Sequence, residues 1–256
     1  MIYVADFYLG GVTLNFTFDD YREIITLLNT NGYHIKTYSS KPSYGKEVIL
    51  RHDIDMSIDK ALDFAYFENS IGVKATYFVL ITSSLYNVFK KENLNKLRKI
   101  QNLGHSIGLH FDETNYNAAG ASDIENAVLN EKKILENILP GIEIETVSMH
   151  MPSKATLEAN LDFNNLIINS YSDLYFKEYK YVSDSLMRWR ENVREIISSN
   201  RYDKLHILTH PIWYDNKLKS KEEKIKSFLC SNKEKLFNEV KTIVPGIEEK
   251  ICSSDF

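Results

Sequence analysis

The sequence predicts an α/β protein built on a parallel sheet, and three observations carry that prediction. Apolar, β-branched runs of strand length alternate with longer segments whose apolar residues recur at helical spacing. The length of 256 residues is usual for a single α/β barrel. Ionisable residues gather where the predicted strands end, which favours a barrel over an open sheet.

The predicted elements alternate along the chain. A helix is expected over 17–32, followed by others at 57–72, 87–104, 122–139 and 220–243. Gly32, Gly72 and Gly104 are read as helix stops, and Ser122 as the cap of the fourth helix. Strands are expected at 47–54, 73–80, 105–111, 144–150, 166–171, 179–185 and 205–210.

Composition limits the classes of function. A formal net charge of −4 with no block of like charges gives no reason to expect a nucleic-acid partner. Two cysteines exclude a disulfide framework and a cysteine metal site. The N-terminus lacks the features of a signal peptide and no long apolar run is present, so a cytoplasmic protein without membrane insertion is expected.

The chain is expected to form one domain over residues 1–256. Within it, residues 1–47 are a helical lead-in and residues 216–256 carry a closing helix. No repeat or low-complexity linker interrupts this domain.

Two pairs of acids are candidates for a catalytic site, and the first lies in FTFDD. Thr17 and Asp20 have the spacing of a helix capping box, and apolar residues follow at Ile24, Ile25 and Leu28. This pair is therefore interpreted as the start of a helix.

The second pair lies in LRHDID, at the end of an apolar strand. Residues two apart on a strand face the same side, so Asp53 and Asp55 project together while His52 faces away. Two converging carboxylates require a cation or a shared proton. A cap on the following helix, from Asp55 or Ser57, would explain one of these acids but not both.

The strand GHSIGLHFD adds candidate metal ligands. His110 lies at its C-terminal end, Asp112 shares the parity of His110, and His105 faces the opposite side as a buried structural histidine. With Asp55, His110 and Asp112 would make an oxygen and nitrogen site suited to Zn²⁺ or a similar divalent ion. Three further strands end in His150, Asp184 and His210, at the pole where α/β barrels gather catalytic groups.

These segments together resemble the polysaccharide deacetylase superfamily, carbohydrate esterase family 4. The resemblance runs from about residue 14 to about residue 215, through LRHDID, IGVKATYFVL, GHSIGLH, KYVSDS and ILTHPIWY. It implies a distorted (β/α)7 TIM-like barrel. The His-Asp-x-Asp form of the first motif resembles a branch associated with surface-polysaccharide biosynthesis.

The resemblance also implies roles for matching positions. Asp53 matches the general base that activates water, and Asp55 matches a metal ligand. His110 matches the first histidine of the metal-binding motif. His210 matches the general acid, and Asp184 the aspartate that orients it.

The chain departs from the family at two positions. Thr114 stands where the family has its second metal histidine, so Asp112, His150 or solvent must complete the coordination. His150 itself stands in SMHMPS where the family's arginine-proline-tyrosine motif has its arginine.

The resemblance implies a metal-dependent hydrolase, with zinc as the expected cofactor, that removes an acyl group such as N-acetyl from a small carbohydrate or sugar conjugate. Substrate contacts are assigned to His150, Trp213, Tyr214, Trp189 and Arg51. Two alternatives remain open. One is a cyclic amide or ureide hydrolase on the same fold, and the other is a metal-free carbohydrate-binding protein with a degenerate site.

Overall fold

The computed structural model describes residues 15–40 and 45–255. Residues 1–14, which hold the predicted non-signal N-terminus and much of the lead-in, lie outside the described residues. The chain divides into two compact units, Met1–Asn216 and Lys217–Phe256. Their union in one domain stays a prediction.

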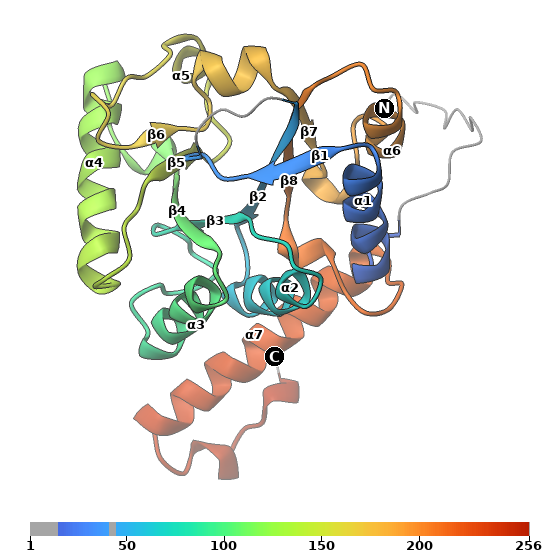
Figure 1. Cartoon of the computed structure of the whole chain (residues 1–256). Coiled ribbons are helices and arrows are strands. Elements are labelled where there is room, and N and C mark those ends of the chain that lie inside the picture. Colours follow the sequence, from blue (N-terminus) through green and yellow to red (C-terminus); the bar gives the residue numbers. More distant parts are fainter. Residues whose placement is uncertain (1–14, 41–44, 256) are drawn as a thin grey trace, which may run out of the picture. The chain divides into compact units, whose positions relative to one another are not determined.

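The first unit is built on one parallel sheet of eight strands, in the order β6-β5-β4-β3-β2-β8-β7, with β1 paired to β2 beside this path. No ladder joins β6 to β7 among the described residues, so the sheet curls without closing (Figure 1). The predicted parallel α/β architecture, with the curled sheet of a distorted barrel, is confirmed. The strands are β1 (Tyr33–Lys36), β2 (Lys46–Ile54), β3 (Thr76–Leu80), β4 (Ser106–Phe111), β5 (Thr146–Met149), β6 (Ile168–Asn169), β7 (Lys180–Ser183) and β8 (Lys204–Thr209).

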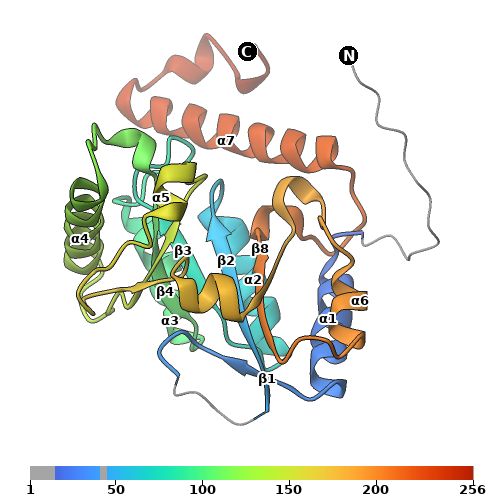
Figure 2. The same ribbon diagram turned by 90° about the horizontal axis from the view of Figure 1, so that it is seen from above.

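Helices surround the outer side of this sheet (Figure 2). Those of the first unit are α1 (Phe18–Thr30), α2 (Ile58–Ser70), α3 (Lys91–Asn102), α4 (Ala121–Ile138), α5 (Lys154–Glu158) and α6 (Val193–Ser198). Strand β1 and the short helices α5 and α6 were not predicted. The predicted cap at Ser122 is wrong, because α4 begins at Ala121 and Gly120 occupies the N-cap position.

Helix caps decide which acids remain for a site. In α1 the Thr17 side chain accepts from the Asp20 amide and Asp20 accepts from the Thr17 amide, which confirms the capping box. In α2 the cap is Ser57, whose side chain accepts from the Lys60 amide. Asp55 is therefore not used as a cap, and both acids of LRHDID remain for other contacts.

Strand β2 is buried along almost its whole length and presents polar groups to both sides. Outward, His52 lies 2.9 Å from the Glu68 carboxylate on α2 and 2.6 Å from the Thr209 hydroxyl on β8. Tyr21 and Tyr77 donate to the same carboxylate at 2.5 and 2.7 Å. This satisfied network fastens the outer helices to the sheet, because Glu68 is fully buried and its oxygens have donors.

His105 belongs to the same outer layer. Its ring is buried, accepts from the Ala75 amide at 3.3 Å and lies 3.5 Å from Glu68. This confirms its interpretation as a structural histidine.

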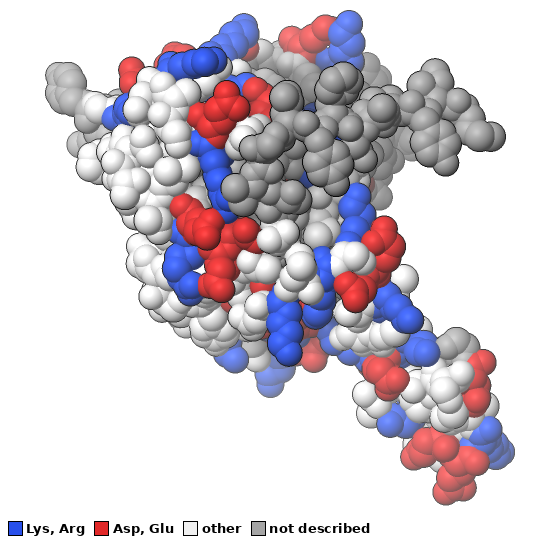
Figure 3. Space-filling view, turned by 90° about the vertical axis from the view of Figure 1, so that its right-hand side faces the viewer, with Lys and Arg blue, Asp and Glu red and all other residues white. Residues whose placement is uncertain are grey.

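The second unit is dominated by α7 (Lys221–Ile243), which starts with a capping box between Ser220 and Glu223. None of the helices in the described part of the chain is both long and apolar enough to cross a bilayer. Acidic and basic side chains are interspersed on the face of the protein shown in Figure 3.

Candidate metal centre and acid-base groups

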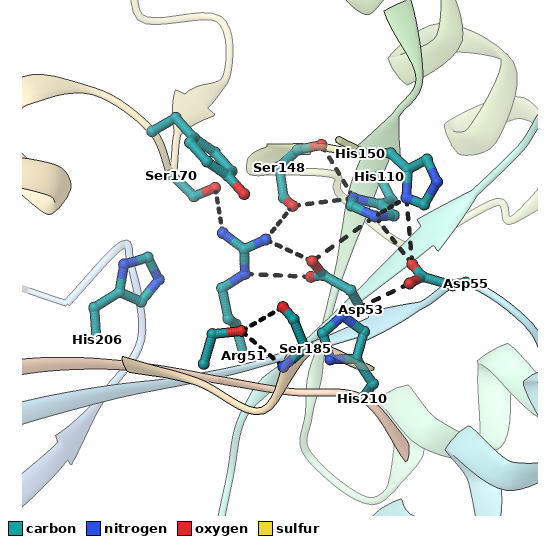
Figure 4. Close-up of polar contacts among 12 residues, drawn as sticks. Arg51, Asp53, Asp55, His110, Ser148, His150, Ser170, Ser185, His206 and His210 are labelled. Atoms are coloured by element: carbon teal, nitrogen blue, oxygen red, sulfur yellow. Dashed lines mark hydrogen bonds and ion pairs between the residues drawn. The ribbon is translucent and has the colours of Figure 1, made fainter. Parts of the chain in front are cut away.

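Side chains from β2, β4 and β5 converge where these strands end (Figure 4). Asp55, His110 and His150 each offer one ligand atom, and these atoms lie within 4.8 Å of one another. His110 Nε2 is 3.2 Å from Asp55 Oδ1 and 3.0 Å from His150 Nδ1. His150 Nδ1 is 3.5 Å from the same oxygen. The sequence separates these residues widely, and the parallel sheet brings them together.

The donor set fits a divalent ion such as Zn²⁺. Two imidazole nitrogens and one carboxylate oxygen are common zinc ligands, and a tetrahedral shell at about 2.0–2.1 Å places ligand atoms about 3.3 Å apart. The three separations, from 3.0 to 3.5 Å, straddle that spacing. Asp55 Oδ1 is also buried without a hydrogen bond of its own, so a cation would supply its missing partner.

The contacts of His110 assign its tautomer. Its Nδ1 lies 3.3 Å from the Ser148 carbonyl oxygen and 3.0 Å from the Ser148 hydroxyl. A carbonyl only accepts, so the proton belongs on Nδ1. The Nε2 lone pair is then free to face Asp55 and His150.

Asp53 lies beside this group, with Oδ2 3.7 Å from His110 Nε2. Burial alone would raise its pKa, but the Arg51 guanidinium and the nearby His110 and His210 outweigh burial and lower it. Asp53 is thus held as a carboxylate, the form a general base requires.

His210 lies on the other side of Asp55, with Nε2 3.6 Å from Asp55 Oδ2. Its Nδ1 donates to the buried Asp184 carboxylate at 2.6 Å, and its backbone amide donates to the same group. Burial would lower the pKa of His210, but Asp184, with Asp55 and Asp53, raises it to about 9. A protonated imidazole with its Nε2 toward the cluster has the form of a general acid.

The contacts of Asp112 differ from the prediction that it binds metal. Its carboxylate accepts from the Thr114 amide at 2.9 Å and from the Thr114 hydroxyl at 2.6 Å. It caps the short turn that follows β4. The third ligand atom of the cluster comes from His150 instead.

Several residues assigned to substrate contact are buried. Arg51 is 0% exposed and Tyr214 is 1% exposed, so neither has a face open to a ligand. Tyr214 packs against Phe64 and Tyr21 with ring centroids 4.9 and 5.7 Å apart. Those two predictions are therefore corrected. Trp213 is buried as well, at 7% exposed.

Trp189 is partly exposed, so its contact with a sugar stays a prediction. Ser148, which contacts both His110 and Arg51, was not among the predicted site residues. Its parity on the strand with His150 is the signal that could have indicated it.

No family model matches the chain, and no curated protein matches it. Solved structures similar to the chain include members of carbohydrate esterase family 4. A mutant of a family 4 pseudoenzyme from Bacillus anthracis, described as having restored enzymatic activity, is 16% identical with a TM-score of 0.46. The match covers 75% of this chain, which spans 64% of the length of that structure.

Two more similar structures carry the names of enzymes. A family 4 carbohydrate esterase from Bacillus anthracis is 16% identical, with 82% of this chain and 85% of that chain covered and a TM-score of 0.43. The catalytic domain of a peptidoglycan N-acetylglucosamine deacetylase from Eubacterium rectale is 15% identical, with 78% and 90% covered and a TM-score of 0.45. At these identities the similarities say nothing about the activity of this chain.

Proposed function

We propose that this protein is a metal-dependent hydrolase that removes an acyl group, most simply N-acetyl, from a sugar or sugar conjugate. One observation carries the proposal. Asp55, His110 and His150 converge on a single ion-sized site, and a carboxylate and a carboxylate-bound imidazole flank it. Those are the groups that metal-assisted hydrolysis of an amide or ester needs.

A divalent ion held by Asp55, His110 and His150 would polarise the acyl carbonyl and a water molecule. We propose zinc, because the two nitrogen donors and one oxygen donor match its usual ligands.

Asp53 and His210 then divide the proton transfers. Asp53 takes a proton from the attacking water, whose oxygen forms a bond to the acyl carbon. His210 gives a proton to the leaving nitrogen or oxygen as the bond from the acyl carbon to that atom breaks. The products are a carboxylic acid and a free amine or hydroxyl on the sugar. Asp184 holds His210 by its Nδ1, which keeps Nε2 aimed at the leaving group.

The test is release of acetate from N- and O-acetylated sugars by zinc-loaded protein, with Asp53→Asn as the decisive variant. Loss of the base is expected to lower kcat by at least about 100-fold, the lower end of what general base catalysis contributes. Asp53→Asn also removes the charge that pairs with the buried Arg51, so its melting temperature should fall, while its zinc content should stay near that of the wild type. Unchanged turnover by Asp53→Asn would exclude the assigned role.

Asp112→Asn is the matched control, because it makes the same chemical change at an acid outside the cluster. Cyclic imides and ureides belong in the same panel. Turnover of these alone would favour the cyclic amide hydrolase. Sugar binding without zinc and without turnover would favour the carbohydrate-binding alternative.

A further inference from the structure

Arg51 is the largest fully buried charged side chain of the site region, and the proton transfers do not use it. It lies on β2, two residues before Asp53 and inside the curl of the sheet (Figure 4). Its Nε donates to Asp53 Oδ1 at 3.2 Å and its Nη2 donates to Asp53 Oδ2 at 2.6 Å. The guanidinium therefore grips both oxygens of the carboxylate.

This two-point contact fixes the plane of the Asp53 carboxylate. A guanidinium presents two parallel donors in a rigid fork, whereas a lysine ammonium would act as a point charge and leave the carboxylate free to rotate. Rotation matters here because Asp53 Oδ2, which accepts from Arg51 Nη2, lies 3.7 Å from His110 Nε2.

The remaining donors of Arg51 reach two serines. Its Nη1 donates to the Ser170 hydroxyl at 3.2 Å, and its Nη2 donates to the Ser148 hydroxyl at 2.5 Å. The rings of Phe78 and Tyr171 lie over the guanidinium, 5.2 and 5.1 Å from its carbon. The arginine is thus held by residues of β3 and β5 and by the two residues that follow β6.

Ser148 connects this arginine to the metal cluster. The hydroxyl that accepts from Arg51 also lies 3.0 Å from His110 Nδ1. Arg51 therefore touches Asp53 directly and reaches a metal ligand candidate through one intervening side chain.

We propose that Arg51 is a positioning residue that sets the Asp53 carboxylate and, through Ser148, the His110 imidazole in one fixed arrangement. The inference rests on the proposed function for what that arrangement does.

The test begins with Arg51→Lys, which keeps the charge and removes the fork. We expect kcat to fall about 10–100-fold with KM and zinc content unchanged, because misplacement of a reacting group by about 1 Å costs up to about 100-fold. Wild-type kcat in this variant overturns the proposal.

Arg51→Met removes the charge as well as the fork, and its thermal stability is measured with and without Asp53→Asn. Removing the arginine alone leaves a buried unpaired carboxylate, so the single variant should melt well below the wild type. The double variant should have a higher melting temperature than Arg51→Met, because it no longer contains the unpaired Asp53 carboxylate. Additive shifts in melting temperature overturn the pairing.

Ser148→Ala and its control Ser170→Ala test the second link. Ser148→Ala should weaken zinc binding about 10–100-fold, as expected for loss of a group that orients a ligand. Ser170→Ala removes a contact of Arg51 alone and should leave zinc affinity unchanged. Equal zinc affinities for the two variants overturn this link.

These measurements separate two failures. A protein that turns over no acylated sugar contradicts the proposed function. The melting and zinc-affinity comparisons still report whether Arg51 couples Asp53 to His110.

Discussion

The sequence offers His150 both as a substrate contact and as one of three ways to complete the metal coordination, and the structure places it among the candidate ligand atoms. Its Nδ1 lies 3.0 Å from His110 Nε2 and 3.5 Å from Asp55 Oδ1. Two ring nitrogens this close need either one shared proton or a common cation. His150, at the end of β5, thus offers the third ligand atom of the candidate site.

His150→Ala is therefore expected to weaken zinc binding by more than about 100-fold, the upper range for loss of a mere ligand-orienting group. Competition with a chromophoric chelator measures this affinity. Asp112→Asn is the control and should bind zinc as the wild type does, since its carboxylate is used by Thr114. The opposite ranking of the two variants would return the third ligand to Asp112.

At the residue scale, face and strand end could be predicted, but distance could not. Alternation along β2 correctly predicted that Asp53 and Asp55 lie on one side of the strand and His52 on the other. The same rule allowed Asp112 beside His110, yet the chain turns after β4 and the acid becomes a cap. Tyr214 was predicted to contact a sugar, but it is buried in the core. The sequence does not show which aromatic rings are buried and which are exposed.

At the scale of elements, α4 contains an acid on its buried face. Glu131 is 2% exposed, accepts from the Tyr116 hydroxyl through Oε1, and has a buried Oε2 without a hydrogen bond. Burial raises its pKa to about 7, with the charge of Asp112 adding to the effect and the Tyr116 hydrogen bond opposing it. Glu131 is thus protonated in the folded state under mildly acidic conditions.

Stability should consequently fall with rising pH. Between the ordinary pKa of 4.5 and the folded value of about 7, the folded state holds a proton that the unfolded state lacks. The free energy of unfolding should drop through this window by about 3 kcal/mol and stay low above it. Urea denaturation from pH 4 to 8 measures the drop.

Glu131→Gln supplies the comparison, because it keeps the size and an acceptor for Tyr116 but cannot ionise. Its stability should vary less across the same pH window and exceed that of the wild type at pH 8. A wild-type pH dependence in this variant would show that another group is responsible.

Among the elements, the helix ends that are defined by a local hydrogen bond were the most predictable. The Thr17–Asp20 box and the left-handed Gly72 and Gly104 depend on neighbours in sequence alone. The predicted cap at Ser122 was wrong because the helix begins at Ala121, with Gly120 as its N-cap. The strand predicted at 166–171 covers only Ile168–Asn169 in the structure, because only these two residues pair with β5 at the edge of the sheet.

For the whole molecule, a bound ion would link separate parts of the sheet. Its proposed ligands lie on β4 and directly after β2 and β5, which an unfolded chain would not hold together. Zinc at about 100 times its dissociation constant should stabilise the fold by about 2.7 kcal/mol. For a unit of this size that corresponds to a rise in melting temperature of about 5–10 °C.

A thermal shift assay with zinc, and then with excess chelator, measures this rise and its reversal. His150→Ala should respond weakly to zinc at the same concentration. An equal melting temperature with and without zinc in the wild type would argue for a site that holds no metal.

The parallel direction of the strands followed from the alternation of strands and helices, because parallel neighbours need crossover connections. Two features did not follow. Strand β1 pairs with residues 46–49 of β2, whereas β3 pairs with residues 51–54 of the same strand. Local sequence patterns do not predict that two strands pair with different parts of β2. The absence of a ladder between β6 and β7 among the described residues likewise depends on contacts remote in sequence.

The two faces of β2 have a consequence for how this gene can vary. The side chains of Arg51 and Asp53 lie on one side of the strand, and that of His52 lies on the other side, where it contacts Glu68. Insertion or deletion of a single codon within Lys46–Ile54 would exchange the sides, turning the guanidinium outward and the imidazole inward. Viable descendants of this sequence should therefore accumulate replacements in that stretch while its length stays constant.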